Sequence, residues 1–180
     1  MSAKPVTVTA GNAVFLNVGF ADPTNTANNA SSVYVYAPNK TVVFKGCSFE
    51  DNQWDAIQDT SKDSTKIVID NCTFALADSR EYCHRFIHIE PRNSDGGYTT
   101  VDASVQITNN IFHADDNTCN DSLITMYGPK FANMTITGNT VIGNITLTDS
   151  HESGNIWISD GLTSTMWSAT KGFEVQENNE

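Results

Sequence analysis

The residues best suited to chemistry gather around one short segment of the 180-residue chain. His88 and Glu90 are two positions apart, so on a β-strand their side chains would emerge from the same face. Arg85 and Arg92 flank this pair, and Asp59 offers a further carboxylate earlier in the chain. An imidazole beside a carboxylate can abstract a proton, and a nearby guanidinium can bind an acidic sugar. We therefore take His88, Glu90, Arg92 and Asp59 as candidate catalytic residues.

Further polar and aromatic side chains are predicted on the same face of neighbouring strands. Aromatic rings can stack on sugar rings, and amide or guanidinium groups can hydrogen-bond to sugar hydroxyls. The candidate carbohydrate-binding residues are Tyr34, Tyr36, Gln58, Tyr127 and Arg85. Outward-facing polar residues are also what any solvated strand face shows, so the alternative is a surface without a ligand.

An internal repeat indicates the elements that would position these residues. One six-residue phrase begins with an apolar residue, carries Asn or Gly at its third position, and ends in Phe or Val. It occurs at 15–20, 44–49, 69–74, 107–112 and 136–141, with starts 29, 25, 38 and 29 residues apart. Strand-forming residues that recur without a helical pattern between them predict coils that stack on one another, as in a solenoid.

Stacking would turn equivalent residues of the phrase into columns with a spacing of about 4.8 Å. The last position predicts an interior spine of Phe20, Phe49, Phe74, Phe112 and Val141. The third position holds residue types that accept a left-handed backbone at a bend, namely Asn17, Gly46, Asn71, Asn109 and Gly138. The fourth position, where stacked Asn side chains can hydrogen-bond along the column, holds Val18, Cys47, Cys72, Asn110 and Asn139.

A second strand signal precedes each phrase, because apolar and polar residues alternate over a few positions. These shorter strands are expected at Val6–Val8, Val33–Tyr36, Trp54–Gln58, Phe86–Ile89, Leu123–Met126 and Ile145–Leu147. The sequence therefore predicts an all-β fold, a right-handed parallel β-helix solenoid of about five to six coils. We expect one domain over residues 1–180, with coils at about 5–160 and a tail at about 161–180 that caps the C-terminal end.

The repeated phrase, with Asn at the corner, resembles the repeats of right-handed parallel β-helix proteins of the pectate-lyase-like kind. That resemblance implies a scaffold shared by polysaccharide lyases and hydrolases, phage tailspikes and surface fibres, and adhesins. It also implies that any polysaccharide chemistry would take place on the outer face of the first strand of each coil. The outward positions there would be Tyr34, Tyr36, Gln58, His88, Glu90, Thr125 and Tyr127.

The catalytic signatures of that family are not found in the chain. The Asn-Thr-Asp and Gly-His-Gly motifs of polygalacturonases are missing, as is the Arg-x-Pro-x-x-Arg stretch of pectate lyases. The segment 58–60 matches a pectin-esterase-like Gln-Asp-Thr phrase at Asp59, but the downstream Gly-Arg-Pro-Trp is absent. These absences favour a module without catalysis.

The four cysteines form two pairs on neighbouring coils. Cys47 and Cys72 share a column, where a spacing of about 4.8 Å exceeds the Cβ separation of about 3.8 Å that a disulfide prefers. We therefore expect free thiols at this pair. Cys83 and Cys119 follow their Phe anchors by nine and seven residues and form a candidate disulfide, with a free pair as the alternative. Such a bond would indicate an extracellular location.

The charge of the chain restricts its partners. With 10 Lys+Arg against 21 Asp+Glu, the formal net charge is −11, and this sign repels the phosphates of nucleic acids and anionic membranes. No apolar run approaches the roughly 18 residues of a membrane span, so no membrane insertion is expected. The first residues lack the pattern of a secretory signal, so we expect either cytosolic synthesis or prior removal of a leader.

The Asp115–Asp116 pair alone does not make a calcium site, so no metal or cofactor is expected.

These observations together predict a non-catalytic structural module with an exposed surface. The favoured hypothesis is a phage virion component, a capsid decoration or fibre protein at the virion surface that forms a homotrimer or docks on a larger assembly. The alternative is a secreted, extracellular bacterial domain that binds polysaccharide or degrades it as a lyase or hydrolase. A segment of an adhesin is a third interpretation.

Overall fold

The computed structural model describes residues 5–21, 31–50, 52, 54–61, 65–76, 83–90, 103–116, 118–126, 131–148, 156–158 and 172–177. Every helix or strand assigned in these ranges is a β-strand, which confirms the all-β prediction. Within the same ranges, no helix has the length and apolar character needed to cross a membrane.

The strands form three sheets, and consecutive strands of the chain pass from one sheet to the next. The first sheet contains, in spatial order, β1 (Val6–Val8), β4 (Val33–Val35), β7 (Asp55–Asp59), β10 (Cys83–Ile89), β13 (Cys119–Met126) and β16 (Ile156–Ile158). The second sheet contains β2 (Ala13–Leu16), β5 (Thr41–Lys45), β8 (Lys66–Asp70), β11 (Ser104–Thr108) and β14 (Asn133–Thr137). The third sheet contains β3 (Gly19–Ala21), β6 (Ser48–Glu50), β9 (Thr73–Ala75), β12 (Ile111–His113), β15 (Asn139–Ile142) and β17 (Phe173–Gln176). We use the word coil for one strand of each sheet in chain order, such as β4, β5 and β6.

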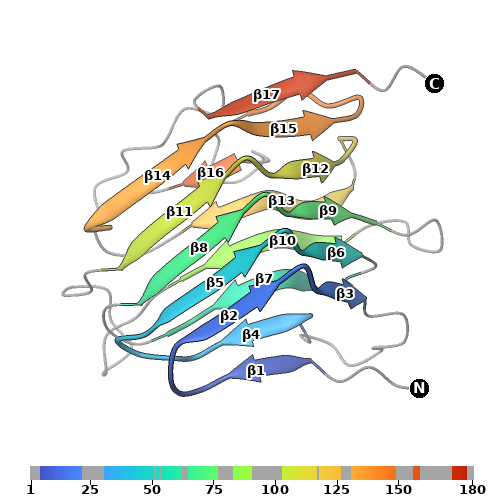
Figure 1. The fold of residues 1–180 in the computed structure, drawn as a ribbon. Coiled ribbons are helices and arrows are strands. Elements are labelled where there is room, and N and C mark those ends of the chain that lie inside the picture. The colour runs from blue at the N-terminus through green and yellow to red at the C-terminus, as the bar shows by residue number, and fades with distance from the viewer. Residues whose placement is uncertain are drawn as a thin grey trace.

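Neighbouring strands in all three sheets are parallel, and equivalent positions of the repeat are partners. In the second sheet, for example, the partners form a row of Phe44, Ile69, Ile107 and Ile136. Figure 1 shows the coils stacked from the N-terminus to the C-terminus, with β2, β5, β8, β11 and β14 on one side of the stack. This arrangement is consistent with a parallel β-helix solenoid.

The interior contains the predicted column of aromatic side chains. Phe20, Phe49, Phe74 and Phe112 are at most 8% exposed, and Val141 continues the column at 0%. Successive phenyl rings are nearly parallel, with centroids 4.8, 4.9 and 4.8 Å apart. This spacing equals the distance of about 4.8 Å between hydrogen-bonded strands, so the ring stack follows directly from the register. Phe15 on Phe44 makes a second stack, at 5.1 Å.

The predicted left-handed bend occurs between the second and third sheets. Asn17, Asn71 and Asn109 have φ values of 54°, 53° and 56°, and Gly46 and Gly138 have 62° and 68°. Glycine is required at Gly46 and Gly138 for a second reason. A Cβ at either position would collide with the Oδ1 atom of the Asn one coil below, Asn17 or Asn109 respectively. Asn and Gly therefore share this column because each fits the conformation and Gly also leaves room for a stacked Asn.

The predicted Asn ladder joins three coils at the next position. Asn110 Oδ1 accepts a hydrogen bond from the Cys72 backbone at 2.9 Å, and its Nδ2 donates to Ile69 O at 3.0 Å. Asn110 Nδ2 also donates to Asn139 Oδ1 at 3.0 Å, and Asn139 Nδ2 donates to Ile107 O at 3.0 Å. Both side chains are buried, so these bonds satisfy backbone groups that turn away from the sheet ladders at the corner.

One strand prediction was wrong. Ile145–Leu147 was expected to begin a new coil, but residues 145–148 have no strand, and Ile156–Ile158 forms β16 instead. Backbone N–H groups of this segment donate hydrogen bonds to side-chain carboxylates instead of to a neighbouring strand. Asn144 N donates to Asp115 Oδ1 at 2.7 Å, and Thr146 N donates to Asp116 Oδ1 at 3.2 Å. The Asp115–Asp116 pair thus holds a loop against the preceding coil.

Part of the predicted C-terminal tail continues the third sheet. β17 pairs with β15 in parallel, and Phe173 is 6% exposed with its ring centroid 6.2 Å from that of Phe112. Asn139 Nδ2 donates to Gly172 O at 3.2 Å, so the corner network reaches this segment. Residues 161–171 and 178–180 of the predicted tail lie outside the described residues.

Substitution of Asn110 by Ala tests the corner network. The change removes the acceptor of Cys72 N–H and the donor to Ile69 C=O, and a buried polar group without a partner costs about 1–3 kcal/mol. We expect Asn110→Ala to lower the free energy of unfolding by about 2–4 kcal/mol in urea denaturation. The exposed Asn133 provides the control, because Asn133→Ala should change stability by less than about 0.5 kcal/mol. Equal losses for both variants would contradict a specific role of the ladder.

Candidate functional site

The candidate site lies on the outer face of the first sheet, where β7, β10 and β13 are neighbours. Each of these strands has two consecutive fully or almost fully buried apolar residues, in the pairs Ala56–Ile57, Phe86–Ile87 and Leu123–Ile124. In each pair both side chains point into the core, so the usual alternation of inward and outward side chains is interrupted. The residues on either side of each pair, such as Arg85 and His88 in β10, therefore belong to the outer face.

Asp55 is the central carboxylate of the site. It is 0% exposed, and its Oδ1 and Oδ2 atoms lie 3.2 Å from His84 Nδ1 and 3.0 Å from His88 Nδ1. Arg85 Nη1 lies 3.6 Å from Asp55 Oδ1. Burial raises the pKa of Asp55, but the hydrogen bonds from His84 and His88 and the charges of His88 and Arg85 outweigh it, so the pKa is below its usual value. Asp55 is therefore an ionised carboxylate surrounded by cationic groups from the next coil.

His88 lies between two carboxylates. Its Nδ1 faces Asp55 Oδ2 at 3.0 Å, and its Nε2 faces Glu90 Oε2 at 3.4 Å. Burial and the charge of Arg85 lower the pKa of His88, whereas Asp55 and Glu90 raise it, and the net effect is a raised pKa. The arrangement favours an imidazolium that donates to both acids. The fraction of His88 that is unprotonated at neutral pH, and so able to accept a proton, is correspondingly reduced.

Arg85 and His84 complete the cluster. Arg85 Nη1 lies 3.0 Å from His84 Nδ1 and 3.3 Å from His88 Nδ1. His84 Nδ1 accepts a hydrogen bond from Arg85 when it carries no hydrogen, and donates one to Asp55 when it does. Trp54 stacks on the His84 ring with centroids 3.8 Å apart and an angle of 13°. We call Asp55, His84, Arg85, His88 and Glu90 the charged cluster.

A buried amide supports the cluster from the preceding loop. Asn52 is 0% exposed, and its Nδ2 donates to Trp54 O at 3.0 Å and Arg85 O at 3.1 Å. The side chain thus connects the start of β7 to β10. Asp55, Asn52, Trp54 and His84 belong to this site but were not among the candidate residues predicted from the sequence. The available signal for His84 was its place directly before Arg85 and four positions before His88.

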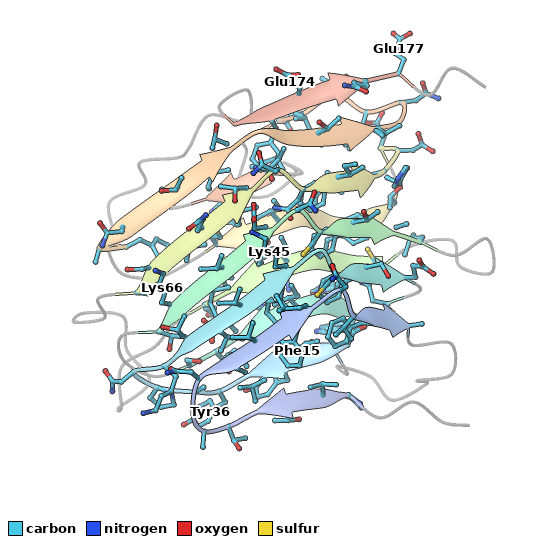
Figure 2. The ribbon with its side chains drawn as sticks, viewed as in Figure 1. Phe15, Tyr36, Lys45, Lys66, Glu174 and Glu177 are labelled. Atoms are coloured by element: carbon cyan, nitrogen blue, oxygen red, sulfur yellow. The ribbon has the colours of Figure 1, made fainter. Side chains whose placement is uncertain are left out.

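The outward column proposed from sequence is present. Tyr34, Gln58, His88 and Thr125 are successive partners across the first sheet. Tyr34 Oη hydrogen-bonds with Thr60 Oγ1 and Gln58 Oε1 accepts from Ser31 Oγ at 2.8 Å, so both polar ends contact neighbouring residues of the protein. Tyr36 lies at the N-terminal end of the stack (Figure 2). Arg92 and Tyr127 lie outside the described residues.

Asp59 does not belong to the outer face. It is the partner of Val35 and Ile89, which are both 0% exposed, and is itself only 1% exposed. Its Oδ1 accepts from Ser61 N at 2.9 Å and from Ser61 Oγ. Burial raises the pKa of Asp59 to about 6, although the Ser61 hydrogen bonds act in the opposite direction. Asp59 is therefore a buried carboxyl group with a raised pKa, separated by the strand from the face that carries His88.

The cysteine pairs differ in their contacts. Cys83 and Cys119 are register partners in β10 and β13, and their Sγ atoms are 2.6 Å apart. Cys47 Sγ instead donates to Phe15 O at 3.4 Å, and Cys72 Sγ to Asp70 O at 3.5 Å. All four are free thiols in this structure, as expected for Cys47 and Cys72.

No candidate metal centre is found in the described part of the chain, where no three His, Cys, Asp or Glu side chains are grouped suitably. The charged cluster is thus described by hydrogen bonds and ion pairs. Comparison of the chain with family models, curated proteins and solved structures finds no match.

The core position of Asp59 has a consequence for the pH dependence of stability. Its folded pKa of about 6 exceeds the reference value of 3.8, so folding binds a proton between these pH values and stability falls as the pH rises through them. Asn is neutral at every pH. We expect Asp59→Asn to be more stable than the wild type by up to about 3 kcal/mol near pH 8, and the difference to disappear near pH 4.

Urea denaturation at both pH values measures this difference. The exposed Glu174 provides a matched control, because Glu174→Gln should show no comparable change between the two pH values. A destabilised Asp59→Asn variant at the higher pH would show that the ionised carboxylate is needed in the core.

The pKa of His88 tests the geometry of the charged cluster. Glu90→Gln removes one of the two carboxylates that favour the imidazolium, so we expect the pKa of His88 to fall, measured by an NMR titration of the ring. In the wild type the pKa is above 6.5, so the stabilising contribution of His88 is present below this pH and is lost as the pH rises through the folded pKa.

Glu50 supplies the comparison for this titration. It is exposed at the end of β6 in the third sheet, so Glu50→Gln should leave the His88 titration unchanged. The same His88 pKa in the wild type and in Glu90→Gln would refute the contact with Glu90.

Proposed function

We propose that the chain is a non-catalytic structural module displayed on the surface of a larger assembly. In this proposal it is a right-handed β-helix of the pectate-lyase-like kind, with about five to six coils and a C-terminal tail that covers the last coil. A phage virion surface, as a capsid decoration or a fibre, is the setting that we favour.

The observation that carries this proposal is the internal neutralisation of the charged cluster. Asp55 comes from β7 and its cationic partners come from β10, so the contacts connect two coils. The low pKa of Asp55 and the raised pKa of His88 both favour the ion pair, whereas a general base must be available in its unprotonated form. A role in holding the coils together therefore accounts for these residues without a reaction.

The ends of the sheets support docking or homotrimer formation. Among the described strands, β1, β2 and β3 each have a neighbour on one side only. Two side chains of β2, Val14 and Leu16, are 61% and 58% exposed. An edge strand with exposed apolar side chains is a favourable place for another chain to pair or pack.

The alternative is a secreted bacterial domain that binds or degrades polysaccharide. The specific observation in its favour is that Arg85, His88 and Glu90 lie on the outer face of the first sheet beside Trp54 and His84. Cationic groups and an aromatic ring in this position suit an acidic sugar. This alternative places the protein outside the cell.

Three measurements separate the proposals. We expect no increase in absorbance at 235 nm with pectate, alginate or other uronic-acid polymers, and no binding on a glycan array. We also expect the protein in constant stoichiometry in purified virus particles. Cleavage or glycan binding that His88→Ala abolishes, while Asn133→Ala at an exposed position of the second sheet keeps it, would overturn the structural proposal in favour of the alternative.

A further inference from the structure

We propose that Cys83 and Cys119 are joined by an intramolecular disulfide when the chain meets a disulfide oxidant such as oxidised glutathione. The bond would connect β10 to β13 directly beside the charged cluster. It would be a covalent modification site in addition to the structural role proposed above, and it does not depend on that role.

The register brings the two cysteines together. Cys83 and Cys119 are partners at the first residues of neighbouring parallel strands, although they are 36 positions apart in the chain. Partners on adjacent strands have a Cα separation within the range of about 4.4–6.8 Å that disulfides use. Their side chains point toward one another, because the two sulfur atoms are in direct contact.

A shift in the strand register explains why this pair meets. The pairing of β10 with β13 shifts between Cys83 and Arg85. Such a shift rotates a side chain away from the direction that regular pairing would give it. Side chains of a regular parallel pair point the same way and remain about 4.8 Å apart, which is too far for a disulfide without distortion.

Cys47 and Cys72 provide the internal comparison. They also lie on neighbouring coils, but the strands on both sides of them, β5 with β8 and β6 with β9, pair without a shift. The two side chains also interact with each other, but each thiol donates to a backbone carbonyl, Cys47 to Phe15 O and Cys72 to Asp70 O. We therefore expect this pair to stay reduced under conditions that oxidise Cys83 and Cys119.

The reaction is a thiol–disulfide exchange in two steps. The thiolate of one cysteine attacks a sulfur of oxidised glutathione, forms a mixed disulfide and releases one glutathione thiolate. The second cysteine thiolate then attacks the protein sulfur of the mixed disulfide and releases the other glutathione. The protein loses two protons and two electrons, and one oxidised glutathione becomes two reduced molecules.

Burial determines when the bond can form. Cys83 is 0% exposed, and the pKa of the Cys119 thiol is well above its usual value because of its burial, its contact with Cys83 and the charge of Asp55. Few thiolates therefore exist in the folded state, and exchange there should be slow. Oxidation is expected mainly while β10 and β13 come together during folding.

The bond would restrict the residues that carry the charged cluster. His84 and Arg85 directly follow Cys83, and the Cys119 end belongs to the next coil. A covalent link at this point holds the start of β10 in the position from which His84 and Arg85 reach Asp55. The disulfide also reduces the conformational freedom of the unfolded chain, because it closes a loop between residues 36 positions apart.

The experiment uses the full chain, unfolded and then refolded in a buffer of reduced and oxidised glutathione. The refolded protein is then denatured in the presence of N-ethylmaleimide, which blocks free thiols. Its intact mass is measured by mass spectrometry, and the protein is digested without reduction. We expect two maleimide adducts, at Cys47 and Cys72, and an intact mass equal to that of the reduced chain plus two N-ethylmaleimide molecules minus two hydrogen atoms. We also expect a linked peptide that contains Cys83 and Cys119. Four adducts, or a link to Cys47 or Cys72, would overturn the proposal.

Thermal unfolding of the oxidised and reduced forms gives a second readout. For a loop of this length in a chain of this size, the disulfide should raise the Tm by roughly 5–15 °C. Cys83→Ser and Cys119→Ser should each abolish the Tm difference, whereas the matched double variant Cys47→Ala/Cys72→Ala should retain it. If the double variant does not fold, the peptide map of the wild type alone decides between the pairs.

Discussion

The register between successive coils is the constraint on which the rest of the structure depends. Each coil places its residues directly over their equivalents, as in the row Phe44, Ile69, Ile107 and Ile136. Parallel pairing alone would permit other alignments, but a shift of one residue would move the apolar face of a strand outward. The stacked phenyl rings, the left-handed corner and the Asn ladder fit only the observed alignment. The left-handed corner and the buried apolar residue at the end of the phrase recur in each of the five repeats, and the Asn ladder adds contacts between three coils, so successive coils stabilise the same register.

The same constraint explains why most of the fold could be predicted from the sequence. The phrase that ends in Phe20, Phe49, Phe74 and Phe112 occurs once per coil because the corner requires a left-handed residue and the interior requires a ring at fixed positions. These are local requirements, so they leave a pattern in the sequence. The segment Ile145–Leu147 has the alternation of a strand, but Asp115 and Asp116 hold its surroundings through side-chain contacts. Such contacts between distant loops leave no periodic signal, which is why the strand prediction was wrong there.

The candidate site could be predicted only in part for a similar reason. His88 and Glu90 are two residues apart on a strand, and this spacing correctly indicated that they are neighbours. The core position of Asp59 follows from alternation with Gln58, which was expected to point outward. The position of Asp55 could not be derived in this way, because the two consecutive inward residues Ala56 and Ile57 separate it from Gln58. A strict alternation carried forward from Asp55 would place Asp55 and Asp59 together. Because Ala56 and Ile57 both point inward, Asp55 lies beside Arg85 and His88 on the outer face, whereas Asp59 lies in the core.

The charged cluster is an unusual way to connect two strands of this sheet. Lys45 and Asp70 form an exposed ion pair on the second sheet, where Figure 2 shows Lys45, and such a pair contributes little to stability. Asp55 is fully buried, and a buried carboxylate is tolerated only when its partners compensate the loss of water. At the equivalent positions of β13, the neutral side chains of Ser122 and Thr125 hydrogen-bond to each other within the strand instead. Because Asp55 is 0% exposed and its partners come from the next coil, the cluster is better suited to hold β7 against β10 than to supply a free base.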